Sequence, residues 1–433
     1  MSDSAVSPYR TIELHDGRPA SWYMVPFERD GRCTGPRTRE RVIEDAATVT
    51  DVFVFSHGWN NDWEATIDRY ESFIAGFGGV HRNGHGLTLR DGYRPLLVGV
   101  FWPSVILVAP GERAPAIAAS GGDPELDEVA AALPEDRASR LVELVSGAPV
   151  LDAGEARELA EIAASLYQGA DDEGVAATRP RPRAEELLAE WQPVAAAQVR
   201  RDSGSWGTVD EGPASAPTAA GFSLDPRKAL RMITVRTMKD RAGVVGARGV
   251  GPLLRDLLDA GDARVHMIGH SYGAKVCLSA ICAEPLPRQV SSALLLQPAV
   301  NHRCFAVDAD GEGRAGGYRG ALDRLAQPIV TTYSAHDQAL TRWFHMALRR
   351  DADEGEAQIA AWPEPPSRFA ALGGYGPRGA EQQTHQIELL DAPNRYPRDA
   401  RIVAVDATRG IKGHGDISNA GTWWALFDQV AEP

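Results

Sequence analysis

A serine between two glycines is the clearest sign of chemistry in this sequence of 433 residues. Ser271 stands in the pentapeptide 269–273 (Gly-His-Ser-Tyr-Gly), after the apolar run 265–268 and before apolar residues at helical spacing. A Gly-x-Ser-x-Gly segment between a strand and a helix is a sharp, strained turn that presents the serine hydroxyl above a sheet. Gly269 and Gly273 leave room for the neighbouring elements, and the helix directs its first N–H groups to the same point. The pattern therefore predicts a nucleophilic serine.

A serine hydroxyl becomes a good nucleophile only when a base accepts its proton, and that base is normally a histidine oriented by a carboxylate. In open α/β sheets functional residues gather at the carboxyl ends of strands, so we searched the residues that follow each predicted strand. His414, in a Gly-His-Gly turn after the last predicted strand, is the predicted base. Asp337, directly after the predicted strand 328–333, is the predicted acid, and it can also cap the next helix. The chain order serine, aspartate, histidine suits a triad on such a sheet.

Other residues stay open for these two roles. The alternative bases are His385, His336 and His345, and the alternative acids are Asp308, Asp310 and Asp416. His385 precedes an apparent strand at 387–390, whereas His336 and His345 are close in sequence to the predicted acid. Asp308 and Asp310 belong to a glycine-rich loop, and Asp416 is very close to the predicted base.

A tetrahedral intermediate of acyl transfer needs N–H donors directed at its negative oxygen. The first predicted donor is the backbone N–H of Tyr272, the residue after the serine. The second is the backbone N–H of Trp59, in the loop that follows the buried strand 51–55. The supporting residues of this loop are His57, Gly58, Asn60 and Asn61. The glycine lets the backbone turn inward, the histidine orients the loop, and the asparagines hydrogen-bond the loop and cap the next helix.

These segments resemble a group of bacterial serine esterases of the α/β-hydrolase superfamily. The resemblance rests on His-Gly-Trp-Asn-Asn at 57–61, Phe-Trp-Pro-Ser at 101–104 and Gly-His-Ser-Tyr-Gly at 269–273. It covers about 52–104 and 264–414, and it implies an α/β-hydrolase fold that hydrolyses carboxylic esters or related acyl groups without a metal or an organic cofactor. It implies no particular substrate.

The residues leave alternatives to this function open. A lipase or phospholipase would use the block between the two matched parts as a lid over a long acyl chain. Acyl transfer to an alcohol or an amine would use the same three side chains with an acceptor other than water. A binding module on a hydrolase fold belongs to another class, because fold alone does not imply function.

The elements that must position these residues alternate between strands and helices, which predicts an α/β fold with a mostly parallel sheet covered on both faces. Buried strands are expected at 51–55, 96–101, 265–268, 292–296, 328–333 and 401–406, with antiparallel edge strands at 11–14 and 22–27. A long helix is expected from about 225 to 259. Its glycines at 246–251 have the wrong order and context for a dinucleotide site, so we interpret them as a break or a close-packing point. A final helix begins after the capping residue Asn419.

The amino-acid composition changes between about 109 and 222, where the chain is rich in Ala, Glu, Asp, Arg and Pro. Apolar residues at helical spacing predict helices around 126–133, 141–145, 159–166 and 187–191. The chain is therefore divided into an α/β core, 1–108 and 223–433, and a helical insertion, 109–222. We expect the insertion to cover the site as a cap; a partly disordered acidic insert is the alternative.

Composition excludes some classes of partner. A net charge of −14 argues against nucleic acid and against stable docking on anionic membranes. Four cysteines without metal-binding spacing are too few for a disulfide scaffold. No apolar stretch approaches membrane-spanning length and the first ten residues lack a signal-peptide pattern, so we expect a cytoplasmic protein, with signal-independent export left open. The expected partner is a small-molecule or lipid ester, and the oligomeric state stays open.

Overall fold

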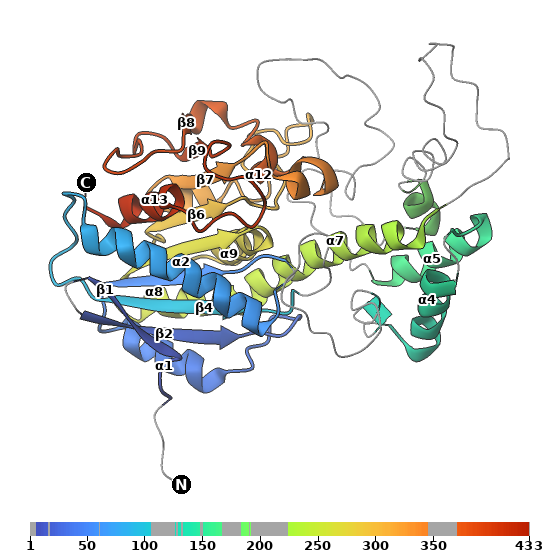
Figure 1. Cartoon of the computed structure of the whole chain (residues 1–433), viewed down its shortest axis with the longest axis horizontal. Coiled ribbons are helices and arrows are strands. Elements are labelled where there is room, and N and C mark those ends of the chain that lie inside the picture. Colours follow the sequence, from blue (N-terminus) through green and yellow to red (C-terminus); the bar gives the residue numbers. More distant parts are fainter. Residues whose placement is uncertain are drawn as a thin grey trace, which may run out of the picture.

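A nine-stranded sheet, mixed and mostly parallel, forms the centre of the computed structural model (Figure 1). The structure describes residues 6–15, 18–59, 61–104, 126, 129–130, 133–147, 150–166, 183–189, 191, 224–344 and 370–432. The strands are β1 (Arg10–His15), β2 (Arg18–Pro26), β3 (Asp51–Ser56), β4 (Pro95–Phe101), β5 (Arg264–His270), β6 (Ser292–Leu296), β7 (Ile329–Tyr333), β8 (Thr384–Glu388) and β9 (Ile402–Asp406). Their order is β1-β2-β4-β3-β5-β6-β7-β9-β8, and the β1–β2 pair is antiparallel. The predicted α/β class is confirmed.

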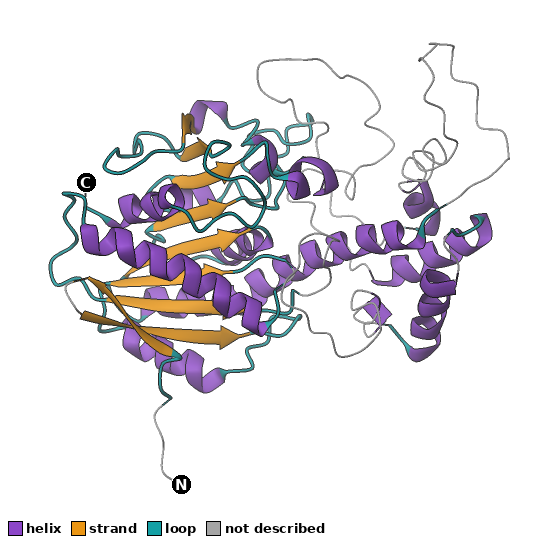
Figure 2. Cartoon of the chain, in the orientation of Figure 1, coloured by secondary structure: helices purple, strands orange, loops and turns teal. Residues whose placement is uncertain are grey.

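Helices cover both faces of the sheet (Figure 2). On one face lie α1 (Pro36–Ala46), α8 (Gly251–Asp259) and α9 (Tyr272–Ala283), and on the other lie α2 (Trp63–Asn83) and α13 (Ala420–Val430). The remaining helical elements are α4 (Glu135–Gly147), α5 (Ala153–Leu166), α7 (Pro226–Val244), η1 (Val245–Val250), α10 (Ala321–Arg324), η2 (Ala339–Trp343), α12 (Leu372–Tyr375) and η4 (Glu381–Gln383). None of the helices that the structure describes is long and apolar enough to cross a bilayer.

The central strand β3 shows why a continuous apolar run becomes a buried strand. All its residues are buried, and successive side chains point to opposite faces of the sheet. Val52 and Val54 enter the core under α8 and α9, whereas Phe53 and Phe55 enter the core under α2 and α13. Because both faces are covered, the strand has no reason to alternate apolar and polar residues.

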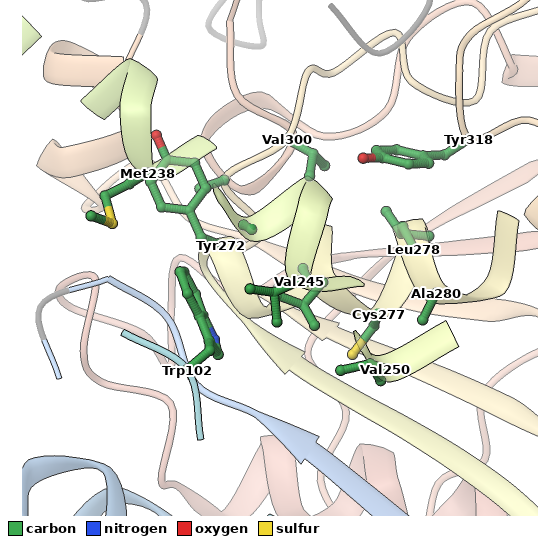
Figure 3. Close-up of a cluster of buried hydrophobic side chains, with 14 of the residues drawn as sticks. Trp102, Met238, Val245, Val250, Tyr272, Cys277, Leu278, Ala280, Val300 and Tyr318 are labelled. Atoms are coloured by element: carbon green, nitrogen blue, oxygen red, sulfur yellow. The ribbon is translucent and has the colours of Figure 1, made fainter. Parts of the chain in front are cut away.

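The long helix predicted before the serine turn is present as three consecutive helical segments, α7, η1 and α8. The middle segment is a π-type turn, and it lies where the glycines cluster. A Cβ on Gly246 would lie 2.5 Å from the carbonyl oxygen of Val276 in α9, so the helices approach there backbone to backbone. Figure 3 shows Val245 and Val250 beside Cys277 at this contact. The interpretation of the glycines as a close-packing point is confirmed.

Two helices of the insertion, α4 and α5, pack against each other and against α7. They fall where helices were predicted, and a backbone bridge joins Leu151 to Leu224 at the start of α7. In Figure 1 they lie away from the sheet, along the far part of α7. Much of the rest of the insertion, including most of the predicted helix at 126–133, lies outside the described residues. The role of the insertion as a cap stays a prediction.

Helix α1 has little sequence signal of its own. It buries only Val42 and Ala46, so its apolar stripe is too narrow to show a helical period. Pro36 lies at its first turn, where the missing N–H costs no hydrogen bond. The final helix α13 was easier to recognise, because Asn419 accepts the N–H of Thr422 in a capping box.

A buried polar cluster lies at the amino ends of β3, β5 and β6. Asp51 Oδ1 accepts hydrogen bonds from Arg264 Nε at 2.8 Å and from His266 Nε2 at 3.1 Å. Because a carboxylate only accepts, Nε2 carries the proton of His266, and Nδ1 accepts the hydroxyl of Ser292 at 2.8 Å. Burial lowers the pKa of His266. Burial raises the pKa of Asp51, but hydrogen bonding and charge from His266 and Arg264 outweigh that effect and lower it overall.

We expect this cluster to make the fold less stable as the pH falls. Both groups have a lower pKa in the folded protein than in the unfolded chain, so unfolding takes up protons once the pH drops below about 6.5 for the histidine and about 4 for the aspartate. A histidine that stays neutral in the folded protein lowers the stability by at most about 1.4 kcal/mol per pH unit below its unfolded pKa. Urea unfolding at pH 7.5 and 5.5 should therefore show a shallower pH dependence for His266→Gln than for the wild type, and an identical slope would contradict this account.

Candidate active site

The turn that carries Ser271 joins the end of β5 to the start of α9. Ser271 has φ 57° and ψ −124°, a backbone conformation that side chains rarely adopt. Its two glycine neighbours are sterically required. A Cβ on Gly273 would lie 2.0 Å from the carbonyl oxygen of Ser56, and a Cβ on Gly269 would lie 2.6 Å from Ala274 N. The sharp strand–turn–helix predicted from the pentapeptide is present.

The three side chains predicted to cooperate form one hydrogen-bonded chain. His414 Nε2 is 2.8 Å from Ser271 Oγ, and His414 Nδ1 is 2.7 Å from Asp337 Oδ2. Since the carboxylate only accepts, Nδ1 carries the proton and Nε2 offers its lone pair to the serine hydroxyl. Asp337 is fully buried, whereas 21% of the His414 side chain is exposed. The arrangement can move a proton from the serine to an imidazole that reaches solvent.

Asp337 is fixed from several directions. Its Oδ1 accepts the N–H of Leu340 at 3.0 Å, so it caps the turn that follows while its Oδ2 faces His414. Gln297 Nε2 donates to the same Oδ2 at 3.1 Å. In turn, Thr332 Oγ1 donates to Gln297 Oε1 at 2.9 Å, which sets the orientation of the amide. Asp337 therefore caps this turn and contacts His414 at the same time.

Sequence reasoning missed Gln297. It is fully buried and has φ 45°, one of few non-glycine residues with positive φ in the described part of the chain. It directly follows β6, so the search at strand ends that found Asp337 would have reached it if amides had been included. Its strained backbone is held where its side chain can bond the carboxylate.

The alternative bases and acids lie elsewhere. None of those that the structure describes is hydrogen-bonded to Ser271 or His414, and His345 lies outside the described residues. His385 pairs with Asp399 at 3.4 Å, and it lies inside β8. The strand predicted at 387–390 was therefore placed too late, because the polar residues of this half-exposed edge strand hid its start. The remaining carboxylates accept backbone N–H groups of their own loops: Asp308 from Gly311, Asp310 from Glu312 and Asp416 from Lys412.

The loop after β3 lies directly against Ser271. A Cβ on Gly58 would be 2.5 Å from Ser271 Cβ, so only glycine lets this backbone come so close. The rings of Trp59 and Tyr272, the two residues predicted as oxyanion donors, are neighbours with centroids 6.4 Å apart. Asn60 lies outside the described residues.

His57 is a buried structural element of this loop. Its Nδ1 donates to the carbonyl oxygen of Gly58 at 2.9 Å, and its Nε2 accepts the backbone N–H of Trp102 at 3.2 Å. The rings of His57 and Trp102 stack with centroids 5.3 Å apart. Figure 3 shows Trp102 below Tyr272. Burial lowers the pKa of His57 to about 3, so it stays neutral at physiological pH. The backbone N–H of His57 donates to the hydroxyl of Tyr70 at 2.7 Å. Tyr70 was not identified from the sequence as a residue near the site.

His270 fixes the turn that carries His414. Its Nε2 donates to the backbone carbonyl of His414 at 2.8 Å, and the two rings lie 4.9 Å apart. Burial, and next the charge of His414, keep the pKa of His270 well below its usual value. A neutral ring at this position adds no positive charge beside the imidazole of His414.

Within the described residues, no group of three or more His, Cys, Asp or Glu side chains is placed to hold a metal ion. Compared with protein-family models, with curated proteins and with solved structures, the chain has no match.

Proposed function

We propose that this protein is a serine hydrolase of the α/β-hydrolase fold, which cleaves carboxylic esters through an acyl-enzyme intermediate. The observation that carries the proposal is the continuous chain from Ser271 Oγ through His414 to Asp337, with links of 2.8 and 2.7 Å. The serine at its end lies on a strained turn at the start of α9, where helix N–H groups converge.

The positions of the three residues in the sheet support the proposal. The nucleophile follows β5, the acid follows β7 and the base follows β9, all at the carboxyl ends of parallel strands. The three strands that precede these residues belong to one continuous parallel run within the sheet order β1-β2-β4-β3-β5-β6-β7-β9-β8, with β5 at the centre of that order.

The proposed reaction has two halves, acylation of Ser271 and hydrolysis of the acyl-enzyme. Ser271 Oγ attacks the ester carbonyl as its proton passes to His414 Nε2, and Asp337 stabilises the imidazolium. The backbone N–H groups of Trp59 and Tyr272 hold the negative oxygen of the tetrahedral intermediate. His414 then returns the proton to the leaving alcohol, which departs and leaves the acyl group on Ser271. In the second half His414 takes a proton from water, the hydroxide attacks the acyl carbon, and the carboxylic acid leaves as the serine regains its proton.

The chain contains a second Ser–His–Asp cluster that serves as an internal comparison. Ser292, His266 and Asp51 have similar spacings, but His266 and Asp51 have no exposed surface and Ser292 lies at the start of a regular strand. Both serines are 1% exposed, so the clusters differ in the histidine: His266 has no exposed surface, whereas 21% of the His414 side chain is exposed. We therefore assign the chemistry to Ser271, where the base reaches solvent.

Covalent labelling tests this proposal directly. A fluorophosphonate probe should modify the intact protein once, and peptide mass spectrometry should place the adduct on Ser271, because of the two described Ser–His–Asp clusters only that of Ser271 has an accessible base. Ser292→Ala should label as well as the wild type, whereas Ser271→Ala should not label. A folded wild-type protein that gains no adduct at Ser271 would instead be a binding module.

A further inference from the structure

Asn61 uses every polar group it has, and its side chain spans the loop beside the nucleophile. It is almost fully buried. Its Nδ2 donates to the carbonyl oxygens of Gly58 at 3.1 Å and Trp59 at 2.8 Å. Its Oδ1 accepts Nε of Arg69 at 3.1 Å. Because Arg69 can only donate, this bond fixes which end of the amide faces the two carbonyls.

The main chain of Asn61 is fixed as well. Its N–H donates to Ser104 Oγ at 3.2 Å, and its carbonyl oxygen accepts the same hydroxyl at 3.1 Å. Ser104 follows β4, so the amide is anchored to the neighbouring strand end and not only to its own loop. A side chain held at both ends in this way can impose an orientation on the peptides that it touches.

The peptide between Gly58 and Trp59 is the one that matters for catalysis. It is trans, so its carbonyl and its N–H point in opposite directions. The carbonyl of Gly58 points towards donors from Asn61 and His57, at 3.1 and 2.9 Å. The N–H of Trp59 is thereby turned away from Asn61, and Gly58 itself packs against Ser271. A flip of this peptide would present a carbonyl oxygen where a developing negative charge needs a donor.

We propose that Asn61, oriented by Arg69, is a positioning residue that keeps the N–H of Trp59 directed at the oxyanion. This inference rests on the proposed function, and it adds to it the residues that preorganise the oxyanion hole. Arg69 also borders the turn of the base: a Cβ on Gly415 would lie 3.6 Å from its Nη1. The same guanidinium therefore lies against the loop that carries Trp59 and against the segment that carries His414. It holds these two segments in a fixed position relative to each other.

The test compares an ester with its sulfur analogue. Asn61→Asp keeps the shape and the acceptor for Arg69 but replaces the amide donor by an oxygen, which repels both carbonyls. The kcat for p-nitrophenyl acetate should fall about 10²-fold with KM nearly unchanged, as expected when one oxyanion donor is lost. The kcat for the corresponding thionoester, whose sulfur is a weak acceptor, should fall much less. The ratio of kcat for the ester to kcat for the thionoester should therefore fall by a factor of about 10². Arg69→Met should lower the ratio in the same direction by a smaller factor.

The outcomes separate the possible failures. A purely structural role of Asn61 would lower both rates equally and leave their ratio unchanged, which would overturn the inference alone. A wild-type protein without Ser271-dependent turnover would overturn the proposed function and this inference with it. Asn394→Asp is the matched control, because Asn394 also donates its amide to a loop carbonyl, that of Asp391 at 3.0 Å, but has no link to the site. Its rates should equal those of the wild type. If Asn61→Asp fails to fold, the ratio for Arg69→Met decides.

Discussion

Replacing Ser271 by alanine is expected to lower the turnover of p-nitrophenyl acetate by a factor on the order of 10⁶. His414→Ala should cost about as much, because the hydroxyl loses the base that lies 2.8 Å away and is a poor nucleophile without it. Asp337→Asn should lower kcat by about 10⁴, since an amide in place of the carboxylate favours the wrong tautomer of His414. Steady-state kinetics on the purified variants provide the measurement.

The double variant makes this prediction sharper. Residues that act as one unit are strongly non-additive, so Ser271→Ala combined with His414→Ala should be hardly slower than either single variant. Additive losses would mean that the two residues act independently, which contradicts a shared proton transfer. Ser292→Ala is the matched control, because it removes the hydroxyl of the buried Ser–His–Asp cluster. Its turnover should remain that of the wild type.

Gly273→Ala is expected to lower the free energy of unfolding by about 3 kcal/mol or more. The new methyl group would lie 2.0 Å from the carbonyl oxygen of Ser56 and 2.5 Å from that of His57. Both are backbone atoms at the end of the central strand β3, so no side chain can turn aside to make room. Either the start of α9 or the loop after β3 must move. Urea unfolding followed by circular dichroism gives the measurement.

Gly79→Ala provides the control for this substitution. Gly79 lies inside α2, and a Cβ there meets no atom within 4 Å. Alanine is favoured over glycine in a helix interior, so this variant should be unchanged or more stable by about 0.5–1 kcal/mol. If Gly273→Ala matched the stability of Gly79→Ala, the close approach between α9 and β3 described above would be wrong.

The two Ser–His–Asp clusters show that residue types and distances do not by themselves make a catalytic site. In both clusters the histidine bonds a carboxylate through one nitrogen and a serine through the other. They differ in position along the strands. Asp51 and its partners lie at the amino ends, under the covering helices, whereas Ser271 and its partners follow the carboxyl ends. Only the second location combines a strained turn, a helix start and a base that reaches solvent.

Much of the fold followed from local pattern. The strands around β3 and β5 were predictable because strands buried on both faces are continuous apolar runs, and α13 because it has a wide apolar face and a cap. Helix α1 and strand β8 were missed or misplaced because each buries few side chains, so their formation depends on what they pack against. Propensity and periodicity carry no information about such partners.

For the site, local sequence patterns were sufficient to predict the serine turn and a short list of partners. The glycines beside Ser271 have a local steric cause, and parallel strands bring their carboxyl ends to one edge, so residues after those strands had to meet. Three-dimensional packing was needed to bring Gln297 to Asp337, 40 residues away, and to anchor Asn61 on Ser104, 43 residues away. Such bonds form only where backbone positions agree to within a hydrogen-bond length. Sequence patterns specify which groups reach the edge of the sheet, and three-dimensional packing specifies which of them touch.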